Sequence, residues 1–412
     1  MKKKISALLL CAVIIFSVFS LSSCYLLSDK VVGGLLTDSG GNTGGGSGDT
    51  NNITINGVAA TGEVLAASKA LLSSVSIVCK FYGYSNALFG QYGSYTHGGS
   101  GVIYKLDKTS GDAYIITNYH VVYDEGASTS NKICSEISVF LYGKEHPDYV
   151  VNAAYVGGSS QYDIAVLKVS GSKILAASAA EEAKFANSND VAVLETVIAI
   201  GNAQGEGISA TVGHVNVDSE QIDLDGDSQG IREFRVIRTD AAVNEGNSGG
   251  GLYNLDGDVV GIVNAKMIDS KVDNIGYAIP SNIAKAIADN IIFYCDGTRE
   301  ECPKRVIMGI NITNTNLRTE YDTETGKVRL YENAIVDSLE KNAPVKDIIK
   351  VGDIINSITV DGVKYEVTRT FHVVDAMLNA RATSKVSMNV TRGNQSIDVE
   401  IPISESMLVN CK

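Results

Sequence analysis

The sequence predicts a mainly β protein with two folded parts. Val64–Tyr84 predicts an apolar helical turn or two and then the strand Val75–Cys79. From there to about Ala278, short extended runs alternate with glycine-rich turns, a pattern typical of all-β barrels. The chain has 412 residues, enough for two or three domains, and a second series of strand-like runs follows Pro303. Hydrophobic residues make up 44% and charged residues 20% of the chain, as in ordinary globular proteins. We expect a β-barrel domain over residues 64–294 and an α+β domain over residues 305–405.

The N-terminus predicts a targeting segment. Three lysines in Met1–Lys4 precede the apolar run Ile5–Leu21, the order of charge and hydrophobicity found in secretory signals. The run ends in Leu21–Cys24, which resembles the lipobox of bacterial lipoproteins. We expect residues 1–23 to be removed and Cys24 to carry acyl chains that anchor the protein to a membrane. A plain signal peptide or a single-span anchor with a cytosolic tail is the alternative.

Residues 24–63 predict a flexible tether between this anchor and the folded chain. Gly, Asn, Ser and Thr dominate Ser39–Gly57, and Gly44–Gly48 is the extreme case. Such a composition buries too little apolar surface to offset the entropy of ordering. A phosphate-binding loop is excluded, because no strand precedes the glycines and no helix with Lys-Ser/Thr follows them.

The formal charge of the whole chain, −13, argues against nucleic acid as a partner.

The stretch Asp240–Gly250 predicts a loop that carries a nucleophilic serine. Ser248 has Gly246 before it and Gly249 and Gly250 after it. Glycines allow backbone conformations that other residues avoid, and they let a substrate approach the main chain. Acyl transfer needs an exposed hydroxyl beside backbone N–H groups aimed at a developing oxyanion. A common Gly/Asn/Ser turn between strands is the alternative.

Two side chains earlier in the sequence, those of His120 and Asp163, have the chemistry to activate this serine. His120 lies in the apolar run Ala113–Val122, which predicts a buried strand that delivers the imidazole to a loop. Asp163 stands immediately before the strand-like run Ile164–Val169, where an unpaired carboxylate is costly to bury. A satisfied core histidine and a strand-start cap are the alternatives for each residue alone. The order His, Asp, Ser is that of chymotrypsin-type proteases.

Cysteines and acidic residues give no evidence for a metal or another cofactor. Five thiols remain outside the N-terminal segment, and Cys295 and Cys302 bracket a short polar loop that a disulfide would close in an oxidising compartment. Metal binding there is the weaker alternative, because no CxxC or HxxxH pattern accompanies the pair. Asp223 begins a stretch like a calcium loop, but Ser228 and Phe234 replace its required glycine and glutamate.

The C-terminal part predicts a helix and then a small α+β domain. Ser281–Ile292 should be helical, with Ser281 as its cap and isoleucines at four-residue steps. Strand-like runs after Pro303 and a helix over Val373–Ala380 complete the second domain.

Eight stretches resemble, in order and spacing, the HtrA/DegP family of serine proteases. The likeness covers nearly all of residues 64–404. Glu245 and Gly251 stand where the family usually has proline, which leaves the resting conformation of the serine loop open. The stretches are Gly99–Ile103, Ile116–Val122, Tyr162–Lys168, Val197–Asn202, Thr239–Ala241, Gly246–Gly250, Gly257–Ile262 and Gly276–Ser281.

The resemblance implies a chymotrypsin-like double β-barrel followed by a PDZ domain. It implies a serine endopeptidase with Ser248 as nucleophile, His120 as general base and Asp163 as the group that orients the imidazole. The oxyanion hole would use the backbone N–H groups of Gly246, Asn247 and Ser248. Substrates would be unfolded or misfolded extracytoplasmic proteins.

The resemblance also implies further recognition sites. Ala242, six residues before the nucleophile, would floor the specificity pocket and favour cleavage after small or medium aliphatic residues. In the PDZ domain, the stretch Ile307, Met308, Gly309 and Ile310 would bind a peptide C-terminus; a plain strand with a glycine bulge is the alternative. An aromatic cluster around Phe81 lies near the family's trimer contact, which raises the expectation of a homotrimer. A catalytically idle, surface-anchored PDZ scaffold is the alternative function.

Overall fold

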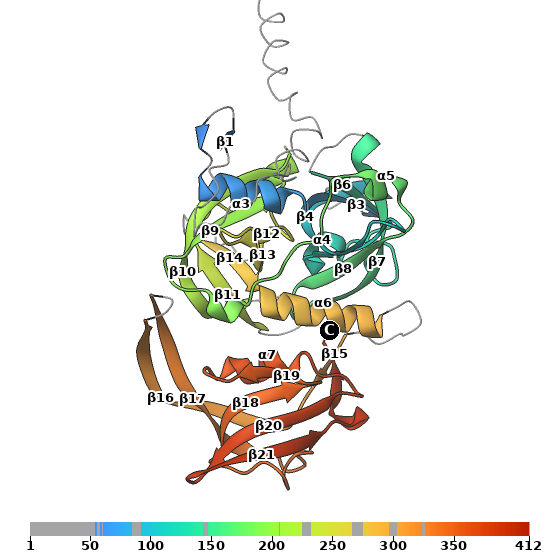
Figure 1. The fold of residues 1–412 in the computed structure, drawn as a ribbon. Coiled ribbons are helices and arrows are strands. Elements are labelled where there is room, and N and C mark those ends of the chain that lie inside the picture. The colour runs from blue at the N-terminus through green and yellow to red at the C-terminus, as the bar shows by residue number, and fades with distance from the viewer. Residues whose placement is uncertain are drawn as a thin grey trace, which may run out of the picture. The chain divides into compact units, whose positions relative to one another are not determined.

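The computed structural model describes residues 54–55, 58–59, 61–84, 92–142, 147–205, 207–224, 232–265, 275–295, 303–323 and 326–411. Strands β1 (Thr54–Ile55) and β2 (Val58–Ala59) pair with each other in a first unit, residues 1–59. All other elements belong to a second unit, residues 60–412 (Figure 1). Within the described ranges, no helix combines the length and the apolar character needed to cross a membrane.

Six antiparallel strands close the first barrel, in the order β3-β4-β5-β8-β7-β6. Alternate residues of β6 face the barrel core, as period-two burial requires, whereas β8 is buried along almost its whole length. The helix α3 (Gly62–Leu71) precedes β3 in the sequence, and the short helix α5 (Lys173–Ala177) follows β8. The strands are β3 (Ser74–Tyr84), β4 (Tyr92–Asp107), β5 (Asp112–Thr117), β6 (Glu136–Leu141), β7 (Val150–Ser159) and β8 (Ile164–Val169).

A second closed barrel follows, in the order β10-β11-β14-β13-β12-β9. Strands β12 and β13 are buried at every residue, which explains their uninterrupted apolar sequences. Two closed six-stranded barrels confirm the predicted double-barrel fold. The strands are β9 (Thr196–Gly201), β10 (Ser209–Leu224), β11 (Arg232–Thr239), β12 (Gly251–Tyr253), β13 (Val259–Val263) and β14 (Gly276–Pro280).

One hydrophobic cluster joins the two barrels to helix α6 (Ser281–Tyr294). Val166 from the first barrel and Ile262 from the second belong to it, together with Ile287 from α6. Helix α6 packs on β8 and β13 and on helix α7 (Phe371–Met377) of the C-terminal domain, so it lies between the barrels and that domain (Figure 1). The strand ends that meet between the barrels are therefore held by a shared core.

The C-terminal domain is a mixed α+β fold. Its sheet has the strand order β16-β17-β18-β20-β21, with β19 added to β18, and α7 (Phe371–Met377) packs on β18 and β19. Strands β15 (Lys304–Val306) and β22 (Leu408–Asn410) form a separate pair. The sheet strands are β16 (Ile310–Asp322), β17 (Lys327–Leu339), β18 (Ile354–Val360), β19 (Val363–Glu366), β20 (Lys385–Arg392) and β21 (Gln395–Pro402).

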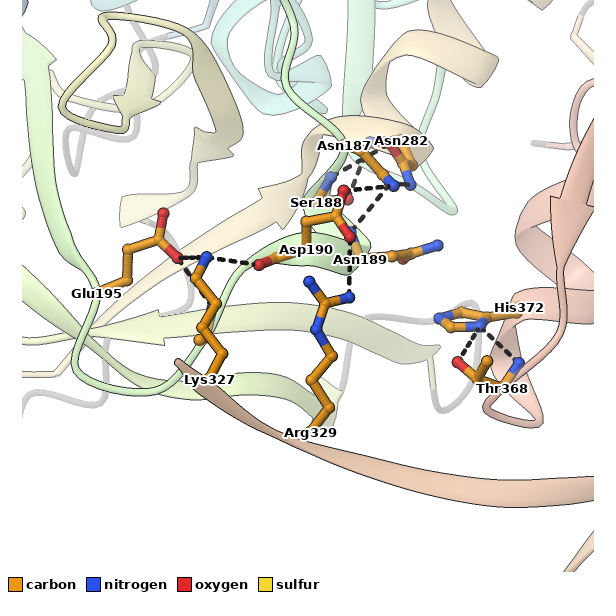
Figure 2. A network of polar contacts seen from close by, with 11 residues as sticks. Asn187, Ser188, Asn189, Asp190, Glu195, Asn282, Lys327, Arg329, Thr368 and His372 are labelled. Atoms are coloured by element: carbon orange, nitrogen blue, oxygen red, sulfur yellow. Dashed lines mark hydrogen bonds and ion pairs between the residues drawn. The ribbon is translucent and has the colours of Figure 1, made fainter. Parts of the chain in front are cut away.

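Polar contacts join this domain to the segment that leads into β9. Lys327 Nζ lies 2.9 Å from Glu195 Oε2, and Arg329 Nη1 lies 2.9 Å from Asp190 Oδ1 (Figure 2). The Asp190 side chain is 56% exposed, so its pair is a surface contact of small energetic value.

A third ion pair, between the second barrel and the C-terminal domain, is buried. Arg235 on β11 contacts Asp375 on α7, and their side chains are only 8% and 10% exposed. The ring of Phe371 stacks under the guanidinium, 4.3 Å from Arg235 Cζ. A cavity of about 560 Å³ lies beside this pair and is lined from both sides of the contact. The domain contact therefore combines an exposed rim with a desolvated centre.

Two local expectations were wrong. The predicted strand Ala113–Val122 ends at Thr117, and residues Tyr119–Val122 form the single helical turn α4, because the Tyr123 N–H donates to Tyr119 O within the turn and the Asp163 carboxylate accepts the His120 N–H. Ser281 does not cap α6: its hydroxyl donates to Ala186 O at 2.6 Å. Cys295 is disulfide-bonded, and its expected partner Cys302 lies outside the described residues.

Candidate active site

His120 projects from α4, directly after β5 ends. Its Nδ1 lies 2.7 Å from Asp163 Oδ2, and its backbone N–H donates to Asp163 Oδ1 at 2.9 Å. One carboxylate therefore contacts both the ring and the main chain of the same histidine. This double contact fixes the ring orientation and leaves Nε2 as the nitrogen available for chemistry.

Asp163 is held in a conformation that few residues adopt. Its φ is 48°, in the left-handed region that Asp tolerates better than most side chains, and the residue is only 8% exposed. Ile164 begins β8 immediately after it. Unusual backbone geometry of this kind persists where the surroundings over-determine it, which is frequent at functional sites.

Two asparagines that sequence analysis missed complete the surroundings of Asp163. Asn264 Nδ2 donates to Asp163 Oδ2 at 2.7 Å, and Asn118 Nδ2 donates to Asp163 O at 2.9 Å. Both asparagines are fully buried. Asn118 was detectable as a polar residue two positions before His120 in an apolar run. No local pattern marks Asn264, which is 101 residues from Asp163 in sequence.

The predicted serine loop is a tight turn between the two barrels. The Ser100 N–H donates to Ser248 O at 2.8 Å, and the Gly249 N–H donates to Val263 O at 3.0 Å. Gly249 has a φ of 85°, and a Cβ there would lie 2.2 Å from both Ser100 O and Thr117 Oγ1. Glycine is therefore required at this position for space as well as for conformation.

The Ser248 hydroxyl points toward the end of β13. Its Oγ accepts a hydrogen bond from the Ala265 N–H at 3.2 Å. Ala265 follows Asn264, so consecutive residues contact Ser248 and Asp163. Within the described ranges, no hydrogen bond joins Ser248 Oγ to the His120 ring. The His–Asp half of the candidate triad is assembled, and the Ser248 hydroxyl is hydrogen-bonded to the Ala265 amide instead of the imidazole.

The amides around Ser248 differ in how they are used. The Asn247 N–H donates to Asn244 O at 3.0 Å and closes a turn. The N–H groups of Gly246 and Ser248 donate to no acceptor among the residues that the structure describes. Gly246 has a φ of 93°. Two of the three amides expected in the oxyanion hole are thus available, whereas that of Asn247 is occupied.

The remaining predicted positions are spread over both domains. Ala242 is exposed, and its carbonyl accepts from Thr211 Oγ1 at 2.9 Å. Phe81 is fully buried in the first barrel, where its ring stacks on Tyr95, so it is a core residue. Cys24 lies outside the described residues. No cluster of three or more His, Cys, Asp or Glu side chains suited to a metal occurs in the described part of the chain.

The stretch Ile307–Ile310 leads into the edge strand β16. β16 pairs with β17 on one side, and it is the terminal strand of its sheet. Met308 is buried and Gly309 has a φ of 69°. The Ile307 N–H donates to Met407 O at 2.7 Å, so this amide is not free to receive a ligand.

Comparison with known proteins decides the family. A model of the trypsin-like peptidase domain matches residues 99–262. The serine protease Do-like HtrA of Lactococcus lactis subsp. lactis (strain IL1403) is 30% identical over 318 residues, which cover 75% of this chain and 71% of the relative. This chain belongs to the HtrA family of serine proteases. The family expected from the sequence motifs is confirmed.

Other HtrA relatives match smaller shares of their own length. Serine protease Do-like HtrA of Bacillus subtilis (strain 168) is 44% identical over 197 residues, 47% of this chain and 39% of the relative. Periplasmic serine endoprotease DegP of Escherichia coli (strain K12) is 30% identical over 321 residues, 77% of this chain and 59% of the relative. This HtrA-family chain therefore aligns with about two-fifths of the Bacillus relative and three-fifths of DegP.

Proposed function

We propose that this chain is a serine endopeptidase that hydrolyses unfolded or misfolded extracytoplasmic proteins. The 2.7 Å contact between His120 Nδ1 and Asp163 Oδ2 carries the proposal, because it leaves a histidine nitrogen free beside the Ser248 turn. The relatives HtrA and DegP are serine proteases, which supports the reaction, and DegP is periplasmic, which supports the compartment.

The reaction begins with a rotation of the Ser248 side chain. Its Oγ leaves the Ala265 N–H and approaches His120 Nε2, which removes the hydroxyl proton as Oγ attacks the substrate carbonyl. Asp163 stabilises the charged imidazole that results. The N–H groups of Gly246 and Ser248 receive the oxyanion. Since the Asn247 amide is already used in a turn, we leave Asn247 out of the oxyanion hole.

The second half of the reaction uses the same groups in reverse. The His120 imidazolium donates its proton to the leaving amine, which leaves an acyl group on Ser248. Water then attacks the ester with His120 again acting as base, and the carboxylate product departs. The exposed, uncharged Ala242 favours small or medium aliphatic residues before the cleaved bond.

Peptide binding and anchoring complete the proposal. The C-terminal domain over residues 305–405 acts as a PDZ domain, in which the free edge of β16 after Met308–Gly309 adds a peptide C-terminus as a further strand. Bound peptide would shift the serine loop toward the conformation in which Ser248 Oγ contacts His120 Nε2. Cys24 carries the lipid, and residues 24–63 tether the protease. The homotrimer stays a prediction that light scattering can test.

Hydrolysis of an unfolded, fluorescently labelled protein tests the reaction. Ser248→Ala should lower kcat/KM by at least about 10⁴-fold, because loss of the nucleophile removes the covalent route. Ser110→Ala is the matched control, since Ser110 is exposed on the turn between β4 and β5. If Ser248→Ala keeps the activity of the Ser110→Ala protein, the proposed nucleophile is wrong.

A further inference from the structure

Two free thiols of the first barrel lie in contact, away from the candidate triad. Cys79 on β3 is fully buried and Cys134, in the segment between α4 and β6, is partly exposed; neither is in a disulfide. Cys134 packs against the hydrophobic core cluster to which Cys79 belongs, and a hydrogen bond between the two thiols shifts the pKa of each. Beside them, the Ser135 N–H donates to Lys80 O at 2.8 Å. Backbone pairing therefore holds both sulfur atoms in place.

The two thiols differ in reactivity. The hydrogen bond to Cys134, and then burial, raise the pKa of Cys79 well above its usual value. The same hydrogen bond lowers the pKa of Cys134, because a donated S–H stabilises a thiolate. The accessible sulfur, that of Cys134, is thus the better nucleophile, and the buried sulfur of Cys79 stays protonated. Redox-active dithiols share this arrangement of an exposed attacking thiol and a buried resolving thiol.

We propose that Cys79 and Cys134 form a reversible dithiol–disulfide site whose oxidant is a low-molecular-weight disulfide. The Cys134 thiolate attacks one sulfur of the small disulfide, which forms a mixed disulfide and releases one small thiolate. Cys79 then gives up its proton and attacks Cys134 Sγ, which releases the second small thiolate. Both released thiolates take up the two protons that the protein loses. The protein dithiol is oxidised by two electrons and the small disulfide is reduced.

Oxidation would brace the segment that carries the candidate base. The Cys134 N–H donates to Val122 O at 2.9 Å, and Val122 ends the helical turn that contains His120. A bond from Cys134 to β3 therefore fixes this turn against the barrel wall. It also closes a long loop of the unfolded chain, which stabilises the folded state.

Oxidised glutathione added to the reduced full-length protein tests the proposal. Peptide mapping by mass spectrometry should find a direct Cys79–Cys134 link, and the Tm should rise by roughly 10 °C. Dithiothreitol should reverse both changes. Cys134→Ser should abolish them, whereas Cys411→Ala should not; Cys411 is a free, buried cysteine elsewhere, and burial raises the pKa of its thiol to about 12.

The Cys79→Ala protein separates the two steps, because Cys134 should then retain one glutathione as a stable mixed disulfide. Three results would overturn the proposal: no Cys79–Cys134 link in the wild type, a lasting glutathione adduct on wild-type Cys134, or a Tm rise that survives Cys134→Ser. None of these readouts depends on peptidase activity, so the proposed function and the redox site can fail separately.

Discussion

The buried pair between Arg235 and Asp375 predicts a large loss of stability in Asp375→Ala. Both side chains are at least nine-tenths buried, and Arg235 Nε has no hydrogen-bond partner within the described ranges. Burial raises the pKa of Asp375 even though Arg235 opposes the shift, and burial lowers the pKa of Arg235. Removing the carboxylate would leave a desolvated charge without a partner, which costs about 3–5 kcal/mol.

Two further proteins make this magnitude testable. Asp190→Ala removes the exposed partner of Arg329 and should lower the free energy of unfolding by less than about 1 kcal/mol. The double variant Arg235→Met/Asp375→Leu removes both buried charges, so it should be considerably more stable than Asp375→Ala.

Urea unfolding at pH 7, followed by far-UV circular dichroism, gives the free energy of unfolding of each protein. The expected order of stability is wild type, then Asp190→Ala close behind, with Asp375→Ala lowest. The reasoning is refuted if Asp375→Ala loses no more than Asp190→Ala, or if the double variant is as unstable as Asp375→Ala.

Three other predictions concern pH, catalysis and specificity. Burial, followed by the nearby arginines, lowers the pKa of His372 to about 3, and its Nδ1 accepts from the Thr368 N–H (Figure 2). Unfolding therefore takes up a proton below about pH 6.5; the free energy of unfolding should fall as the pH drops from there toward 3, and His372→Gln should flatten that part of the profile. Asn264→Ala removes a hydrogen bond to the ionised Asp163 and should lower kcat by roughly 10- to 100-fold with little change in KM; a change in KM alone would contradict the positioning role. Ala242→Asp should move cleavage in a peptide library toward Lys and Arg, and an unchanged profile would show that this residue does not floor the pocket.

Much of the fold was predictable because local patterns encode it. Alternating and uninterrupted apolar runs mark the barrel strands, and isoleucines at four-residue steps, such as Ile283 and Ile287, mark the buried face of α6. Asp163 was correctly placed next to the start of β8. In each case, burial acts on residues that are close in sequence, so the amino-acid order alone carries the information.

The parts that escaped prediction depend on distant partners. The helical turn at His120 is held by the carboxylate of Asp163, which lies 43 residues away in sequence and directly before the neighbouring strand β8. Asn264 contacts the same carboxylate from the second barrel. The Cys79–Cys134 contact and the Arg235–Asp375 pair likewise join segments that no local pattern relates. Such contacts appear only when the whole chain is folded.

Labelling with a fluorophosphonate probe, followed by peptide mapping, tests the central claim most directly. The probe reacts with a serine only where a base activates its hydroxyl beside an oxyanion site. We predict one adduct, on the peptide that contains Ser248, and its loss in His120→Ala. A folded wild-type protein that takes up no probe, or an adduct on Ser248 that persists without His120, would contradict the proposed proton transfer.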